Sequence, residues 1–201
     1  MIFYEEEVYM EMRKLSEFVT FVQGINQSRA EKQFGNQEID YYDQASFEED
    51  HKYYNEATQE ERVNYLFDQE VSLDKRDVVI SNSLQRATMV SGQNVGKVLS
   101  LNFTKVEFKS DLLDKRYFLY LFNNHKDIQR QKDRGLQGTG PVLRLTKQSL
   151  EQLVIPLPLI EEQRKIGGIY TESLKLQSKL SIYTRLLEQF TNSMLEKSLE
   201  E

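Results

Sequence analysis

The sequence predicts a mixed α+β domain followed by one long C-terminal helix. The first part of the chain contains short runs with strand periodicity, turn formers and one strong helical pattern. Two of the chain's three prolines, Pro156 and Pro158, follow these segments. These two prolines interrupt an apolar run, and no proline follows them. Because proline fits the first turn of a helix but not its interior, Pro158 indicates where a helix starts. We therefore expect a globular domain over 1–158 and a helical segment over 159–201.

The first expected strands are short apolar runs bounded by turn formers. Residues 15–22 favour a strand, or a short helix followed by a strand, that ends at Gly24. Residues 77–81 predict a compact strand, and 87–90 are its expected neighbour. Between these runs, 31–76 has weak periodicity and many turn formers, so the sequence does not predict which helices or strands it forms or in what order.

The clearest strand is expected over 97–108. Leu99, Leu101 and Phe103 alternate there with polar residues. This two-residue period is typical of a half-buried sheet, so the three side chains should share one buried face.

The first strong helix is expected over 114–134. Asp114 can cap its start, and apolar residues recur through it at three- and four-residue spacing. A flexible loop over 135–140 follows it, rich in glycine. Thr146 should then cap a short helix, and 153–155 should form the last strand of the domain.

Apolar residues recur every seven positions in the C-terminal segment, in two interleaved rows that predict a coiled coil. Only Ser173 is polar in these rows. A 40-residue helix would run about 60 Å, longer than the domain can cover, so we expect a partner helix on most of the seam. A helix packed along its own domain is the alternative. The expected interface residues are Ile166, Ile169, Leu176, Leu180, Tyr183, Leu187, Phe190 and Met194.

Composition excludes several classes of function. The chain has no cysteine, which excludes a disulfide framework, a thiol nucleophile and a thiolate metal site. His51 and His125 stand far apart in polar surroundings, so we expect surface histidines, no metal and no cofactor. An acidic start and the lack of a long apolar stretch favour a cytoplasmic protein without a membrane span.

Charge is distributed unevenly along the chain. Residues 77–147 hold 12 basic and 6 acidic side chains, whereas 1–76 hold 8 basic and 18 acidic ones. A basic segment inside an acidic protein indicates a surface that faces phosphates, although an ordinary solvated face remains the alternative. The acidic residues of 48–61 should then face away from DNA or toward a partner protein.

Three clusters carry side chains suited to reading base edges. Asparagine and glutamine can pair with adenine, and arginine with guanine, while lysines bind phosphates. For the first cluster these residues are Gln23, Asn26, Gln27, Ser28 and Arg29; for the second, Asn82, Ser83, Gln85 and Arg86; for the third, Arg130, Lys132, Arg134 and Gln137. The expected phosphate contacts are Lys97, Lys105 and Lys147.

Several segments, in order along the chain, resemble the specificity subunits of type I restriction-modification systems. The most specific is 146–166, TKQSLEQLVIPLPLIEEQRKI, which matches the joint between a recognition domain and a long helix in that family. The opening 14–19 and the segments 77–81 and 97–103 resemble the domain start and central strands. The family's usual subunit has two recognition domains and two long helices, whereas this chain resembles half of one.

The resemblance implies a non-catalytic subunit that recognises a bipartite sequence in double-stranded DNA. It implies as partners a DNA methyltransferase subunit and, through it, a restriction subunit. For a half-subunit, the equivalent assembly is a homodimer whose helices pair antiparallel and place one recognition domain at each end. Two-fold symmetry in the protein would then impose an interrupted palindrome on the site.

Two other classes of function stay open at this point. In a nuclease, Asp77 and Glu107 could hold magnesium, with Lys109 near the attacked phosphate. A coiled-coil adaptor whose head binds protein would account for the acidic first third. The sequence does not give the DNA site.

Overall fold

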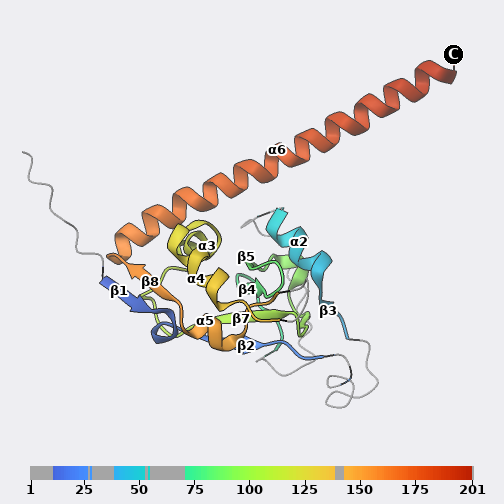
Figure 1. The fold of residues 1–201 in the computed structure, drawn as a ribbon. Coiled ribbons are helices and arrows are strands. Elements are labelled where there is room, and N and C mark those ends of the chain that lie inside the picture. Colours follow the sequence, from blue (N-terminus) through green and yellow to red (C-terminus); the bar gives the residue numbers. More distant parts are fainter. Residues whose placement is uncertain are drawn as a thin grey trace, which may run out of the picture.

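The computed structural model describes residues 11–26, 28, 39–52, 54, 71–138 and 143–200, and shows a mixed α+β domain with a long projecting helix (Figure 1). A four-stranded antiparallel sheet in the order β2-β7-β4-β5 forms the centre of the domain. Its strands are β2 (Val19–Gln23), β7 (Phe103–Phe108), β4 (Val78–Ser81) and β5 (Arg86–Met89). Strand β5 therefore lies at an edge of the sheet.

Two smaller sheets connect distant parts of the chain. Strand β1 (Glu11–Lys14) pairs antiparallel with β8 (Val154–Leu157), so the described N-terminal end lies beside the start of the long helix. Pro156 is tolerated in this two-stranded sheet because a strand there has a free edge. Strand β3 (Tyr41–Tyr42) pairs parallel with β6 (Val98–Leu99).

Apolar side chains cover both faces of the central sheet. Val78 and Ile80 of β4 belong to the main core, together with residues of helix α3 (Lys115–Asn124). Val79 belongs to a second core on the other face, with Phe47 of helix α2 (Gln44–Lys52). The 3-10 helices η1 (Leu15–Glu17) and η2 (Gly92–Asn94) and the helices α4 (Lys126–Gly135) and α5 (Lys147–Glu151) complete the domain.

Both predicted helix caps are confirmed. The Asp114 carboxylate accepts hydrogen bonds from the backbone N–H groups of Arg116 and Tyr117, at 2.9 and 3.1 Å. The Thr146 hydroxyl accepts from the N–H of Ser149 at 3.2 Å. The expected strands over 15–22, 77–81, 87–90 and 153–155 are also present, the first as a 3-10 helix followed by β2.

Two expected elements are interrupted. The helix over 114–134 is two helices, because His125 takes an extended conformation with φ −71° and ψ 123°. The strand over 97–108 breaks between β6 and β7, where the N–H of Phe103 closes a turn onto the carbonyl of Ser100. Leu101 lies in that turn and is 54% exposed, so its expected place on a buried face was wrong.

The two histidines are less exposed than the sequence predicted. His51 is half-buried at the end of α2 and stacks on Phe47, with ring centroids 6.0 Å apart. Burial lowers the pKa of His51 from its ordinary value, and the nearby charge of Arg86 lowers it further. His125, between α3 and α4, is also half-buried.

The long helix α6 (Ile160–Glu200) begins two residues after Pro158, as the proline predicted, and continues well beyond the domain (Figure 1). Its first half packs against α3. Gly167 sits at this crossing, where an added Cβ would lie 2.6 Å from the backbone nitrogen of Tyr117. In the described part of the chain, no helix is both long and apolar enough to cross a membrane.

Candidate nucleic-acid interface

The turn between β4 and β5 holds the second predicted cluster, and its backbone is fixed from several sides. The N–H of Asn82 donates to the carbonyl of Asn102, and the carbonyl of Asn82 accepts from the N–H of Leu145, both at 3.0 Å. The Asn82 side chain is buried and accepts a hydrogen bond from the Thr104 hydroxyl at 3.0 Å. Asn82 therefore anchors the turn instead of presenting its amide to a ligand.

Lys132 anchors the same turn from helix α4. Its side chain is 1% exposed, and its ammonium donates to the carbonyls of Gln85 and Phe122, at 2.8 and 2.7 Å. The ammonium also lies 4.3 Å from the centre of the Phe122 ring. Burial lowers the pKa of Lys132 to about 8. Gln85 has a left-handed backbone with φ 57°, a conformation that persists where neighbouring contacts hold it.

Lys105, predicted to bind phosphate, is also held inside the protein. It is 6% exposed, forms an ion pair with Asp77 at 3.0 Å and donates to the carbonyl of Ser72 at 3.3 Å. A buried, paired lysine cannot reach a phosphate without breaking these contacts. We therefore leave Asn82, Lys105 and Lys132 out of the proposed DNA-contacting set.

Lys97 is half-buried and is already engaged. It donates to the hydroxyl of Ser46 at 2.9 Å and lies 3.8 Å from the carboxylate of Asp40. It therefore bridges α2 and the residue before β3.

The first predicted cluster follows β2 and stays exposed. Gln23 ends that strand, and the Ser28 hydroxyl donates to the side-chain oxygen of Asn26 at 3.3 Å. Gly24 fixes the start of the loop, because an added Cβ would lie 2.0 Å from the carbonyl oxygen of Ser100. The remaining two predicted members, Gln27 and Arg29, lie outside the described residues.

The third cluster lies on α4 and just after it. Arg130, Arg134 and Gln137 are exposed, and Arg130 forms an ion pair with Asp127 at 3.1 Å. The backbone of Gln137 pairs with that of Arg144 in both directions, at 3.0 and 2.8 Å. This pairing brings Arg144, a third exposed arginine that the sequence did not predict as part of the site, beside the cluster.

Lys147 and Arg86, two further residues of the predicted set, are also exposed. Lys147 lies on α5, with its ammonium 4.0 Å from the carboxylate of Glu151. Arg86 begins β5, and Asn123 hydrogen-bonds both to its neighbour Ala87 and to Tyr170 of α6. Arg86 is therefore close to the long helix as well as to the turn.

The proposed nuclease residues do not form a metal site. Asp77 is paired with Lys105, Glu107 accepts from the Thr20 hydroxyl at 3.2 Å, and Lys109 donates to a backbone carbonyl at 2.6 Å. Among the residues that the structure describes, no group of three or more His, Cys, Asp or Glu side chains could hold a metal ion. The structure does not support the nuclease alternative.

The acidic segment 48–61 is described by the structure only at 48–52 and 54, and its acidic side chains there are not uniformly exposed. Glu48 and Glu49 face solvent, but Asp50 is 2% exposed. Its carboxylate accepts from the Tyr42 hydroxyl and the Asn94 amide, both at 2.9 Å. Burial raises the pKa of Asp50 from its ordinary value. Asp50 thus joins α2 to the core and does not belong to an outward acidic face.

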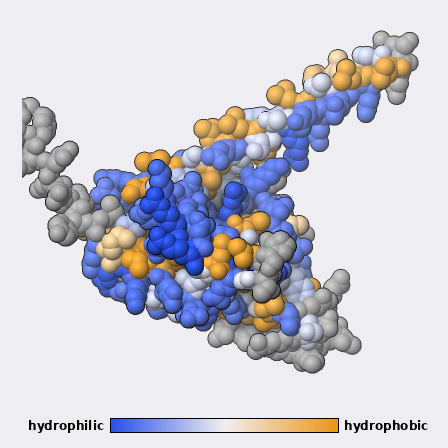
Figure 2. Space-filling model, in the orientation of Figure 1, coloured by the Kyte–Doolittle hydropathy of each residue, from blue (hydrophilic) through white to orange (hydrophobic). Residues whose placement is uncertain are grey.

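The apolar row of α6 lies opposite the side that packs on the domain, and Figure 2 shows apolar side chains along this helix. Ile166 packs against the core instead, with Tyr170 and Leu174, so the domain already covers part of the expected interface. The other seven residues of the row are between 51% and 73% exposed: Ile169, Leu176, Leu180, Tyr183, Leu187, Phe190 and Met194.

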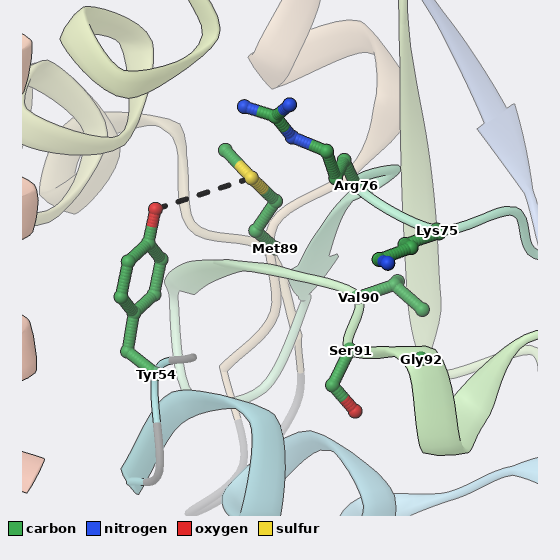
Figure 3. Close-up of a pocket in the computed structure, with 7 residues that line it drawn as sticks. All are labelled: Tyr54, Lys75, Arg76, Met89, Val90, Ser91 and Gly92. Carbon is green, nitrogen blue, oxygen red and sulfur yellow. Dashed lines mark hydrogen bonds between the residues drawn. The ribbon is translucent and has the colours of Figure 1, made fainter. Parts of the chain in front are cut away.

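One shallow pocket of about 280 Å³ lies between β5 and the segment before β4 (Figure 3). Its lining includes Lys75, Arg76 and Ser91, and the Tyr54 hydroxyl donates to the sulfur of Met89 across one side, at 4.0 Å. This volume includes open solvent, and the cavity itself has room for about one water molecule, about 10 Å³, so we assign it no ligand.

Comparisons with known proteins agree on one family. The family model described as "Type I restriction modification DNA specificity domain" matches residues 7–183. The type I restriction enzyme MjaVIII specificity subunit of Methanocaldococcus jannaschii is 23% identical over 134 residues, which are 63% of this chain and 30% of that protein.

Two solved structures have a similar fold. The HsdS subunit from Thermoanaerobacter tengcongensis matches with a TM-score of 0.55 at 18% identity, over 93% of this chain and 44% of its own. A structure reported for complex assembly and conformational transition of the type I R-M system matches with a TM-score of 0.58 at 17% identity, over 94% and 44%. The chain therefore spans less than half the length of each of these proteins.

Proposed function

The chain belongs to the family of type I restriction-modification DNA specificity domains, and from this premise we propose that it recognises DNA sequence for a type I complex without catalysing a reaction. The match over 7–183 carries this proposal, because it includes both the globular domain and the part of α6 that packs on it. The partners we propose are double-stranded DNA, a methyltransferase subunit and, through that subunit, a restriction subunit.

The proposed DNA surface consists of the exposed and half-buried polar and basic side chains that the structure describes in the three clusters, together with Lys147. It excludes the buried anchors described above and adds Arg144. Asparagine, glutamine and arginine provide base-edge contacts, and lysine provides phosphate contacts. The set is Gln23, Asn26, Ser28, Ser83, Gln85, Arg86, Arg130, Arg134, Gln137, Arg144 and Lys147.

The assembly we propose is a homodimer in which the exposed row of α6 pairs with the same row of a second chain. Exposing seven large apolar side chains on one face of a helix to water is unfavourable, and burying them against a partner helix would stabilise the pair. Antiparallel pairing would place one recognition domain at each end of the helix pair. Such a dimer would recognise two symmetric half-sites separated by a fixed spacer.

Co-expression with a cognate methyltransferase subunit tests the proposal. We expect methylation at a gapped, symmetric motif in the host genome, mapped by sequencing that detects modified bases. Methylation at an asymmetric bipartite motif would keep the specificity role but exclude the symmetric homodimer. Absence of any new motif would contradict the specificity role.

Salt titration of duplex binding separates DNA recognition from a protein adaptor. A recognition domain should lose affinity steeply as salt rises, because phosphate contacts release counterions, and should still discriminate among sequences. Weak binding that is blind to sequence, even with the methyltransferase subunit present, would favour the adaptor.

A further inference from the structure

The apolar row of α6 extends along both the domain and the projecting part of the helix. Ile169 lies on the stretch that packs against α3, yet it is 73% exposed on the outer side, and Met194 near the other end is 51% exposed. Figure 2 shows apolar side chains along the outer edge of the helix. A partner that covers the whole row must therefore run beside the domain as well as along the projecting part.

The row is large enough to hold two chains together. Its seven apolar side chains are between 51% and 73% exposed. At roughly 100 Å² of free surface each, two such rows give about 1,400 Å². Stable protein–protein interfaces bury about 1,200–2,000 Å² in total, so a second copy of the row provides enough surface.

Reversing the partner helix gives every apolar residue of the row a counterpart in one register. The two-fold axis of this register lies between residues 181 and 182, and residues equally far from the axis face each other across the two chains. Every layer then joins an a position of one helix to a d position of the other. The layers are Leu180 with Tyr183, Leu176 with Leu187, Ser173 with Phe190 and Ile169 with Met194.

Side-chain size favours the reversed register over a parallel pair. Ser173, the small polar member of the row, faces the large ring of Phe190, and its hydroxyl already accepts a hydrogen bond from the Gln177 amide at 3.2 Å. In a parallel pair each residue would face its own copy, so two serines would leave a gap and two phenylalanines would overfill their layer. Lys197, one heptad after Phe190, would also face its own copy, and like charges repel each other.

A slip of the reversed register by one heptad leaves part of the row without a suitable counterpart. Moving the axis toward the domain places Phe190 opposite Ile166, which already packs on the core, and Met194 opposite Glu162. Moving it away places Ser173 opposite Lys197 and no residue of the row opposite Ile169. The central register therefore pairs the row most completely.

Resting on the homodimer of the proposed function, we propose that α6 pairs antiparallel with its own copy in this one register. The two Gly167 crossings then lie about 43 Å apart along the helix pair, at 1.5 Å per residue. A slip of one heptad would change this distance by about 10 Å, which is about 3 base pairs at 3.4 Å each. The facing apolar residues thus set the distance between the two recognition domains.

Introduced cysteines test the register, because the chain has none of its own. The full chain with Leu176→Cys and Leu187→Cys should form a disulfide-linked dimer after mild oxidation, measured by non-reducing electrophoresis. A disulfide needs Cα atoms within about 7 Å, which the facing positions allow. Each single variant should stay unlinked, because the two copies of either residue would lie about 16 Å apart along the pair.

Two further variants report the slipped registers. Ile169→Cys with Leu187→Cys would link if the axis lay nearer the domain, and Leu176→Cys with Met194→Cys would link if it lay farther away. We expect both to stay at the level of random collision.

Arg185→Cys with Asn192→Cys is the matched control, because it places two thiols on the opposite, exposed face of the same helix. It measures the disulfides that form by random collision. We expect the Leu176→Cys, Leu187→Cys variant to give at least tenfold more linked dimer than this control.

Each contrary result has its own meaning. Linkage of the single variants would indicate a parallel pair, and linkage of a slipped-register variant would indicate another register. Either result, or no excess over the opposite-face control, overturns the proposed register, while a wild type that sediments as a dimer keeps the homodimer. A wild type that sediments as a monomer overturns the homodimer itself, and methylation mapping tests the DNA-recognition role separately.

Discussion

The side-chain amide of Asn123, near the end of α3, pairs with both backbone groups of Ala87 on β5. Its oxygen accepts from the N–H of Ala87 and its nitrogen donates to the carbonyl of Ala87, each at 2.8 Å. The same nitrogen donates to the Tyr170 hydroxyl of α6 at 3.2 Å. Because β5 is an edge strand, Asn123 takes the place of a missing neighbour strand and joins the hairpin, α3 and the long helix.

Replacing Asn123 with alanine should destabilise the domain. Ala87 is 1% exposed, so its N–H and carbonyl would lose their partners inside the protein. We expect a loss of about 1–3 kcal/mol in the free energy of unfolding, measured by denaturant titration. Asn124→Ala is the control, because Asn124 is exposed on the same helix. Equal effects of the two substitutions would contradict the role of Asn123.

The pKa of Lys132 predicts a pH dependence of stability. Burial lowers it to about 8 from the ordinary 10.5, so between these values the unfolded chain binds more protons than the folded chain. Stability contributed by this group therefore rises with pH across that window, by at most about 1.4 kcal/mol per pH unit.

Lys132→Met isolates this contribution, because the other titrating groups cancel between the two proteins. The free energy of unfolding of the wild type relative to the variant should increase from pH 8 to pH 10. A difference that stays constant or falls as pH rises would contradict the buried lysine. The variant should also be less stable at pH 7, because the carbonyls of Gln85 and Phe122 lose their donor.

Local chemistry made part of the fold predictable from the sequence. Asp114 and Thr146 cap helices through their own side chains and the next turn of backbone, so the residues involved are adjacent in sequence. Pro158 fixed the start of α6 for the same reason. The break at His125 had no such signal, because neither glycine nor proline marks it and Ile128 continues the apolar spacing into α4.

The candidate site depended more on contacts between distant parts of the chain. Lys132 is flanked in the sequence by charged residues that are exposed in the fold. Its own side chain is buried, where the carbonyls of Gln85 and Phe122 accept its hydrogen bonds. Lys105 is likewise held by Asp77 across the sheet. Base-reading chemistry can be recognised from residue types, but which side chains serve as anchors follows from tertiary pairing.

Two adjacent glycines in α6 should respond oppositely to alanine. At Gly167 an added Cβ would lie 2.6 Å from the backbone nitrogen of Tyr117 and 2.8 Å from the Cβ of Arg116. Gly167→Ala must therefore push α6 away from α3, at a cost of about 1–3 kcal/mol. At Gly168 nothing lies within 4 Å, so Gly168→Ala should stabilise the helix by about 0.5–1 kcal/mol. Thermal and denaturant unfolding measure both, and destabilisation by Gly168→Ala would contradict the open environment.

The apolar row of α6 predicts self-association that a single charge can weaken. Leu187 is 65% exposed at the middle of the free part of the row, where the domain does not cover the helix. Leu187→Glu would place a carboxylate in the proposed helix pair, twice per dimer, and burying it unpaired is costly. We expect at least a tenfold increase in the dimer dissociation constant, measured by sedimentation equilibrium. Asn192→Glu adds the same charge to the opposite face of the exposed helix and should leave the constant within about twofold. Equal weakening of the dimer by both variants would indicate general charge repulsion and not pairing through the apolar row. A wild-type chain that stays monomeric at micromolar concentration would exclude the homodimer.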